Sequence, residues 1–170
     1  MGDNIEMKQK VEFKVTETKN NILKKINISL DIFYNSDFEL IELNTQERAI
    51  SHKLACYLQE CFKNYDVDCE YDKHGEYIKK LDHISECSEE KKTNRILPDI
   101  IIHKRKFDDH NLAVFEIKSK KRAISCDIKK LELMTKQDGQ FKYKFGFFIK
   151  FEKERKDCRI EVYINGEKQE

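Results

Sequence analysis

The sequence predicts an α/β protein with a mixed central β-sheet flanked by helices, in the order helix, three strands, helix, two strands. Three observations support this fold class. An amphipathic helical pattern follows Asn44, a polar turn joins two apolar runs at 96–104 and 111–118, and residues 112–151 have the pattern of a strand, a helix and a strand. Because such a crossover normally makes its strands parallel and a hairpin makes them antiparallel, the sheet should be mixed.

The first element of this core is a helix within residues 44–64. Asn44 and Glu47 have the spacing of a capping box, in which the Glu47 side chain would bond back to Asn44. The apolar residues that recur along one helical face are Ile50, Leu54, Tyr57, Leu58, Cys61 and Phe62. Upstream, residues 20–34 also have a helical apolar spacing. The sequence leaves the role of residues 1–43 open, as a packing arm, a dimer contact or a docking segment.

The remaining elements belong to one globular domain spanning residues 44–170. Alternating apolar and acidic residues at 67–73 predict a strand with one solvated face. Two runs have apolar residues at successive positions and should therefore be interior strands. After the first helix we expect strands at 67–73, 96–104 and 111–118, a helix at 125–136, and strands at 143–151 and 158–164.

Composition and charge limit the classes of function. No apolar stretch approaches the roughly 20 residues of a membrane span, and no hydrophobic signal region opens the chain, so the expected location is the cytoplasm, away from membranes. The net charge is only +1, yet residues 1–95 carry 15 Lys and Arg against 19 Asp and Glu, whereas residues 96–170 carry 18 against 13. Local basic clusters can hold phosphate backbones, although a solvated charged surface is the alternative explanation.

Six cysteines raise the question of disulfides or a metal cluster. None of them forms a C-x-x-C pair, and no secretion signal accompanies them. Free thiols are therefore expected, and a zinc or iron–sulfur site is not.

Charged residues stand at the ends of both interior strands. Glu116 and Lys118 are two positions apart and project to the same face of their strand. Asp99 follows the chain's only proline, Pro98, which marks the start of the neighbouring strand. In an antiparallel hairpin these ends meet, so two carboxylates and a lysine should converge. Burial of two unpaired carboxylates costs free energy, which Mg²⁺ would offset because it prefers hard oxygen ligands.

These residues resemble a known family. The stretches "PDIII" at 98–102 and "EIK" at 116–118, the preceding helix with Glu47, and the order of elements are similar to the PD-(D/E)XK, or restriction-endonuclease-like, nuclease superfamily. The resemblance covers roughly residues 44–151. It implies a restriction-endonuclease-like core and hydrolysis of phosphodiester bonds that depends on Mg²⁺ or Mn²⁺.

The resemblance also implies roles for individual residues. Asp99 and Glu116 would be metal ligands, the main-chain carbonyl of Ile117 would face the metal, and Lys118 would be the catalytic lysine. Glu47 would be a further catalytic residue, with helix capping as its alternative role. Contacts to nucleic acid are expected from Lys104, Arg105, Lys120, Lys121, Arg122 and Lys130.

The expected function is that of a DNA endonuclease acting in defence or repair. RNA as substrate and assembly into a homodimer are left open by the sequence. The alternative is a non-catalytic protein of the same fold that binds nucleic acid or a partner protein.

Overall fold

The computed structural model of the chain describes residues 17–71, 73–74, 77–78, 97–105, 107, 110–120 and 124–170, with the backbone alone at 73–74 and 77–78. The helices are α1 (Lys19–Ser36), α2 (Glu39–Glu42), α3 (Glu47–Cys61) and α4 (Ser125–Thr135), and a 3-10 turn spans Arg155–Asp157. The strands are β1 (Asp66–Cys69), β2 (Lys73–His74), β3 (Tyr77–Ile78), β4 (Ile100–His103), β5 (Ala113–Lys118), β6 (Phe145–Lys150), β7 (Arg159–Ile164) and β8 (Glu167–Lys168).

Six strands form a mixed sheet in the order β1-β4-β5-β6-β7-β8. Strand β4 pairs antiparallel with β5, and β5 pairs parallel with β6 across the α4 crossover. The other pairs in this sheet are antiparallel. Both the predicted hairpin and the predicted parallel crossover are therefore confirmed, as is the α/β class with a mixed sheet and flanking helices. Strands β2 and β3 form a separate two-stranded sheet.

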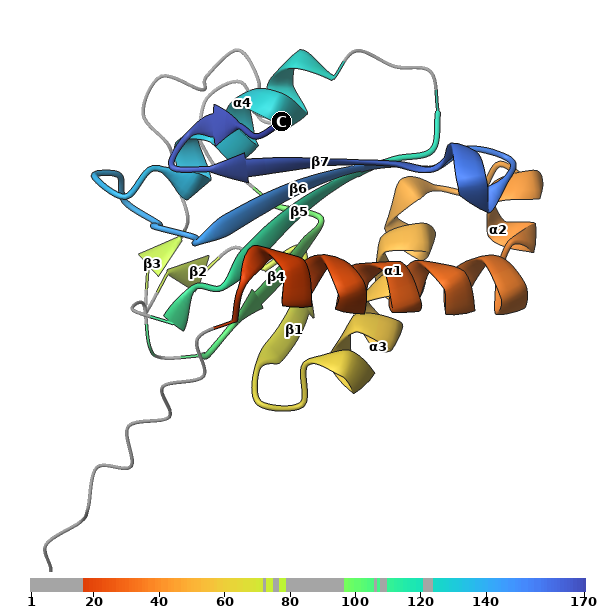
Figure 1. Cartoon of the computed structure of the whole chain (residues 1–170), viewed down its shortest axis with the longest axis horizontal. Helices are drawn as coiled ribbons and strands as arrows, with labels where there is room; N and C mark the ends of the chain where they lie inside the picture. The colour runs from red at the N-terminus through yellow and green to blue at the C-terminus, as the bar shows by residue number, and fades with distance from the viewer. Residues whose placement is uncertain are drawn as a thin grey trace, which may run out of the picture.

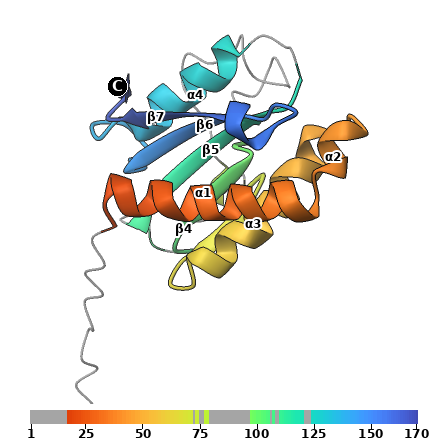
Figure 2. The same cartoon turned by 45° about the vertical axis from the view of Figure 1, so that its right-hand side comes forward.

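The sheet separates two helical layers (Figures 1 and 2). Helices α1 and α3 pack on one face against Ile102, Phe115, Phe147 and other apolar side chains of the strands. Helix α4 covers the opposite face through Leu131 and Met134. The interior strands are buried on both faces, as their continuous apolar runs predict.

Helix α1 is part of the main hydrophobic core. Its buried side chains at Ile22, Ile26, Leu30 and Phe33 recur every three or four residues, the spacing of one helical face, and pack in the core with α3 and the sheet. The Tyr34 hydroxyl donates to the main-chain carbonyl of Glu152 at 2.8 Å. The sequence leaves open a packing arm, a dimer contact or a docking segment before residue 44. For residues 19–36, the structure shows packing against the core.

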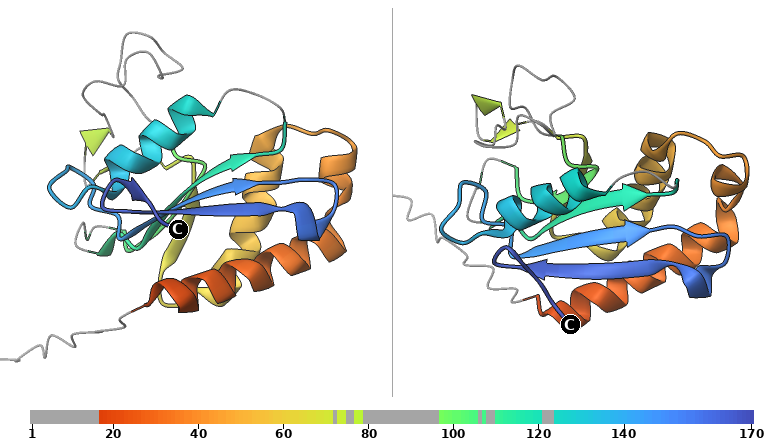
Figure 3. Two further views of the ribbon diagram at one scale, coloured as in Figure 1. Left: turned by 45° about the horizontal axis from the view of Figure 1, so that its top comes forward. Right: turned by 90° about the horizontal axis from the view of Figure 1, so that it is seen from above.

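Helix α4 lies close to β6 because of a glycine. A Cβ atom at Gly146 would come within 2.9 Å of Thr135 Cγ2, closer than side chains tolerate. Figure 3 shows α4 lying across the strands on its side of the sheet. This close approach fixes the position of the polar side chains on the sheet-facing side of α4, which matter for the site below.

Two expectations about composition can be compared with the structure. Cys56, Cys61, Cys69 and Cys158 are free thiols, as expected, but Cys126 is disulfide-bonded, so the expectation is wrong for that residue. Spacing alone could not reveal this bond, because disulfide pairing depends on which loops meet in space.

Across the described ranges, no helix combines the length and the apolar character that crossing a membrane requires.

We predict that truncating one core side chain of α1 strongly destabilises the protein. Ile26 is fully buried, so Ile26→Ala should lower the free energy of unfolding by about 2–5 kcal/mol through lost burial and a residual cavity. Ile28→Ala, on the same helix at a side chain that is 43% exposed, should cost less than about 1 kcal/mol. Urea denaturation of both variants measures the difference, and equal effects would contradict the packing of α1 described here.

Candidate active site at the paired ends of β4 and β5

The hairpin brings Asp99 and Glu116 to the same end of the sheet. Ile100 pairs with Phe115, and one further step of this antiparallel register sets Asp99 opposite Glu116. Both side chains lie on the α4 face, because Ile101 and Val114, two residues away on each strand, pack in the α4 core. The convergence that the sequence predicts is therefore present.

The Asp99 carboxylate is held against the main chain of β5. Its Oδ2 atom accepts a hydrogen bond from the N–H of Ile117 at 2.6 Å. Burial raises the pKa of Asp99 to about 6, although this hydrogen bond and the ammonium groups of Lys130 and Lys118 act in the opposite direction. The N–H and C=O of a strand residue point to the same neighbouring strand, so the carbonyl of Ile117 also faces the Asp99 side.

Glu116 is the most deeply buried acid of the site, at 1% exposure. Its Oε2 atom accepts from Lys130 Nζ at 2.6 Å, while Oε1 is buried and has no hydrogen-bond partner among the described residues. Burial raises the pKa of Glu116 well above its usual value, and the nearby Asp99 adds to the rise, whereas Lys130 opposes it. A buried carboxylate oxygen without a partner is costly, and its presence in a folded protein calls for a functional explanation.

Lys118 lies between two carboxylates. Its Nζ atom is 3.0 Å from Asp127 Oδ2 and 3.5 Å from Glu47 Oε2. Burial acts to lower the pKa of Lys118, but Asp127 and then Glu47 outweigh it, so the pKa is raised. Lys118 is consequently a fixed cation at neutral pH and is unsuited to accept a proton.

Glu47 contacts the end of β5 and does not close a capping box. Helix α3 has Gln46 at its N-cap without a side-chain cap bond, and Asn44 has a left-handed backbone with φ of 54°. Glu47 Oε1 instead accepts from the N–H of Ser119 at 3.1 Å. Figure 3 shows the arrowhead of β5 pointing to the side of the molecule where α3 begins. Of the two roles considered for Glu47, the capping box is not formed.

The oxygen atoms at this strand end are of the chemical type that hard divalent cations prefer. Four carboxylates, from Glu47, Asp99, Glu116 and Asp127, face two ammonium groups and leave two negative charges if all are ionised. The orphan Oε1 of Glu116, the Asp99 carboxylate and the Ile117 carbonyl are the oxygen donors that Mg²⁺ or Mn²⁺ prefers. No group of three or more His, Cys, Asp or Glu in the described part of the chain is arranged to hold a metal ion. The metal ligands expected from the sequence are only two carboxylates, Asp99 and Glu116, and the Ile117 carbonyl, so water molecules would complete the coordination of the cation.

The basic residues predicted to contact nucleic acid are spread over both ends of β4. Lys104 and Arg105 follow the end of β4 remote from Asp99. The Arg105 side chain pairs with Asp68 and, at 3.7 Å, with Asp66. Its charge is thus balanced by β1, and it is a poorer phosphate ligand than its sequence neighbourhood indicates.

Two of the other predicted contacts lie nearer the site. Lys120 is two residues beyond the end of β5, and Lys130 forms an ion pair with Glu116. Lys121 and Arg122 fall outside the described residues.

The sequence predicts a solvated face for the acidic residues of β1, but Asp68 on this strand is paired with basic side chains. Asp68 Oδ2 lies 2.9 Å from His103 Nε2 and also pairs with Arg105. Burial acts to raise the pKa of Asp68, but these two partners outweigh it and hold the pKa at about 2. Alternation along a strand predicts which residues share a face, but it does not predict the charged neighbours that a face meets.

Asp127 is a site residue that the sequence prediction did not assign. It lies in the first turn of α4 with its Oδ2 on Lys118 and its Oδ1 3.8 Å from Lys130. The signal available in the sequence is the helical spacing of Asp127, Lys130, Leu131 and Met134, which puts polar and apolar side chains on one sheet-facing side. Once the crossover is accepted, this spacing directs Asp127 and Lys130 toward β5.

Comparison with protein-family models, curated proteins and solved structures finds no match to this chain. The interpretation of the site therefore depends on its own geometry and chemistry.

We predict that Asp99→Asn stabilises the metal-free protein in a pH-dependent way. With a pKa of about 6 in the folded state and about 4 when unfolded, ionised Asp99 destabilises the fold as pH rises from 4 to 6. The penalty is absent below pH 4 and constant above pH 6. Asparagine removes it, so the gain in free energy of unfolding should be near zero at pH 4 and up to about 3 kcal/mol at pH 7.

Urea denaturation in EDTA at both pH values measures this gain. Asp138→Asn, at an exposed position after α4, is the matched control and should show no such pH dependence. An equal loss of stability in Asp99→Asn at both pH values would mean that Asp99 acts only as an acceptor for the Ile117 N–H.

Proposed function

We propose that the protein is a divalent-metal-dependent nuclease that hydrolyses phosphodiester bonds, with DNA as the foremost substrate. The observation that carries the proposal is the buried Glu116 carboxylate, one oxygen of which has no partner within the described part of the chain, opposite Asp99 and two positions from Lys118 on the same strand face. Four carboxylates around two lysines at the end of an interior strand cost stability. A catalytic role explains why they are retained.

Asp99, Glu116 and the carbonyl of Ile117 would hold the cation. When bound, a divalent cation supplies Lewis-acid polarisation of the phosphate and lowers the pKa of an attacking water. The chain itself supplies the fixed charge of Lys118, which stabilises negative charge as it develops on the phosphate oxygens. Asp127 and Glu47 keep Lys118 protonated and oriented, and Glu47 also anchors the end of β5 through Ser119.

Lys120, with Lys121 and Arg122 next to it in sequence, would contact the phosphate backbone beside the site. Such contacts provide affinity that depends on salt and carries little sequence information. This expectation fits an enzyme that cuts nucleic acid with little base specificity.

A second candidate is a non-catalytic role, which one observation favours. Lys118 and Lys130 are both paired with carboxylates inside the fold, so the cluster is partly neutralised without any ligand. In that case the site would be a structural ion-pair network, and the basic residues would bind nucleic acid or a partner protein. Cleavage assays separate the two candidates.

We expect purified protein to nick supercoiled plasmid in Mg²⁺ or Mn²⁺ and to stop in EDTA. Asp99→Ala, Glu116→Ala and Lys118→Ala should each lower the cleavage rate by about 100-fold or more, since each removes a ligand or a charge that acts in the transition state. Single-stranded DNA and RNA assayed in parallel identify the preferred substrate.

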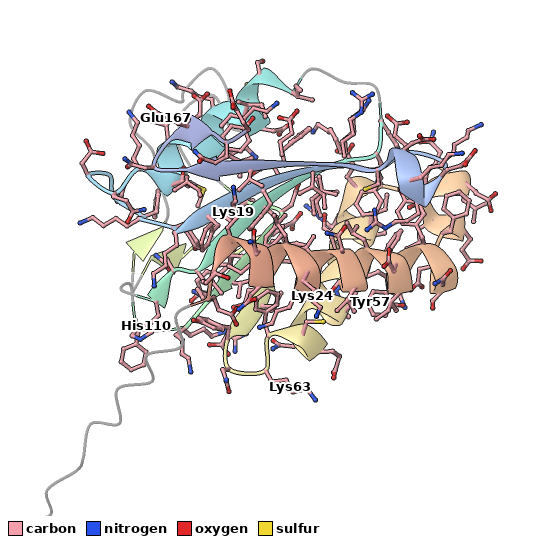
Figure 4. The ribbon with its side chains drawn as sticks, in the orientation of Figure 1. Lys19, Lys24, Tyr57, Lys63, His110 and Glu167 are labelled. Atoms are coloured by element: carbon pink, nitrogen blue, oxygen red, sulfur yellow. The ribbon has the colours of Figure 1, made fainter. Side chains whose placement is uncertain are left out.

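Glu60→Gln is a suitable control, because Glu60 lies on α3 like Glu47 but is exposed beside Lys63, which points away from the core in Figure 4. Cleavage by wild-type protein in chelator, or full activity of Asp99→Ala, would overturn the proposal.

A separate prediction concerns Glu47. Glu47→Gln keeps an acceptor for the Ser119 N–H but loses the charge beside Lys118, so we expect cleavage to fall about tenfold or more. Stability should change by less than about 1 kcal/mol, the usual size of a helix-terminus effect. Thermal melting and plasmid cleavage measure both quantities, and wild-type cleavage by Glu47→Gln would limit Glu47 to a structural role.

A further inference from the structure

We propose that Lys130 is a built-in counter-ion of Glu116 that a divalent cation must displace, so that this side chain sets the affinity of the site for metal. The inference depends on the proposed metal site and adds to it a residue that controls loading. It is carried by the geometry of one ion pair and by the unequal environments of the two Glu116 oxygens.

The fold brings the Lys130 ammonium to one particular oxygen. Lys130 lies one residue before Leu131 on α4, which packs against the sheet, and its Nζ atom is 2.6 Å from Glu116 Oε2. The side chains of Lys130 and Glu116 are only 15% and 2% exposed. Burial of a lysine is costly unless the charge is paired, so the contact with Glu116 is what keeps the ammonium in the interior.

The two oxygens of Glu116 are not equivalent. Oε2 accepts a hydrogen bond from Lys130, while Oε1 is buried and has no partner in the described ranges. One oxygen is therefore available to a ligand while the other holds a positive charge. A dication bound at Oε1 would lie close to that ammonium, and like charges repel strongly where water is excluded.

Asp127 offers the ammonium an alternative position. Its Oδ1 atom is 3.8 Å from Lys130 Nζ, three residues earlier on the same helix. The flexible four-carbon stem of lysine permits a small swing from Glu116 to Asp127. Metal loading would then exchange one ion pair for another without exposing a charge.

This arrangement predicts which cations can enter. Replacing an ammonium by a monovalent cation leaves the charge around Glu116 unchanged and gains little. A divalent cation brings a second positive charge, which attracts the Asp99 carboxylate as well. This added attraction offsets the loss of the ion pair between Lys130 and Glu116. The site should therefore exclude Na⁺ and K⁺ and bind Mg²⁺ or Mn²⁺ weakly in the wild-type protein.

The test is a Mn²⁺ titration of the full chain without nucleic acid, followed by the EPR signal of free Mn²⁺. Lys130→Met keeps most of the side-chain volume and removes the charge, so its dissociation constant should be at least tenfold lower than that of the wild type. Lys130→Arg retains the charge and should bind no more tightly than wild type.

Lys129→Met is the matched control. It makes the same substitution on the neighbouring residue, whose exposed side chain pairs only with Glu132 among the described residues, and should change the constant less than twofold. If Lys130→Met does not fold, Lys130→Gln serves in its place, because glutamine can still donate to Glu116 without a charge.

The outcomes distinguish the two proposals. Mn²⁺ binding that Glu116→Gln abolishes, with an equal or higher dissociation constant in Lys130→Met, would overturn the role of Lys130 and leave the metal site standing. Binding by Lys130→Met alone would support the counter-ion role. Absence of binding at Glu116 in both wild-type and Lys130→Met proteins would overturn both proposals.

Discussion

The buried carboxylate of Glu116 is the constraint on which the rest of this site depends. Burial of a glutamate on an interior strand costs free energy. The charge of Glu116 is tolerated because the Lys130 ammonium, from α4, lies 2.6 Å from its carboxylate. The remaining charges follow from this pair. Asp127 faces both lysines, Lys118 bridges Asp127 and Glu47, and Glu47 in turn holds the main chain where β5 ends. Removal of Lys130 would leave the buried Glu116 carboxylate without its paired ammonium, whereas Lys118 would keep Asp127 if Glu47 were removed.

Each layer of the fold contributes to this arrangement. The β4–β5 hairpin fixes Asp99 opposite Glu116, and the parallel β5–β6 crossover forces α4 to begin above the same strand end. Gly146 allows α4 to approach β6 closely. On the other face, α3 begins beside the end of β5, which brings Glu47 to Ser119. Helix α1 packs against α3 through the shared core, so residues 19–36 contribute indirectly to the position of the site.

Local sequence signals predicted much of this fold. Pro98 marked the start of β4, two-sided apolar runs identified the interior strands, and the length between β5 and β6 required a crossover. Strand periodicity placed Glu116 and Lys118 on one face, and the antiparallel hairpin brought Asp99 to the same end of the sheet. The remaining contacts depend on partners distant in the chain. The same Asn44-x-x-Glu47 spacing suits a cap or a site residue, the target of a long side chain such as Lys130 depends on how α4 crosses the sheet, and Arg105 meets its acidic partners on β1.

Asp99 and Glu116 can form a cation site or merely belong to a structural ion-pair network, and we propose the former. The most direct measurement is a crystal structure of the protein soaked in Mn²⁺, with anomalous data that locate the ion without reference to activity. We expect an anomalous peak at coordination distance, about 2.0–2.4 Å, from Glu116 Oε1, an Asp99 oxygen and the Ile117 carbonyl, with the Lys130 ammonium moved toward Asp127. Crystals that bind Mn²⁺ only elsewhere, with Lys130 still on Glu116, would contradict it.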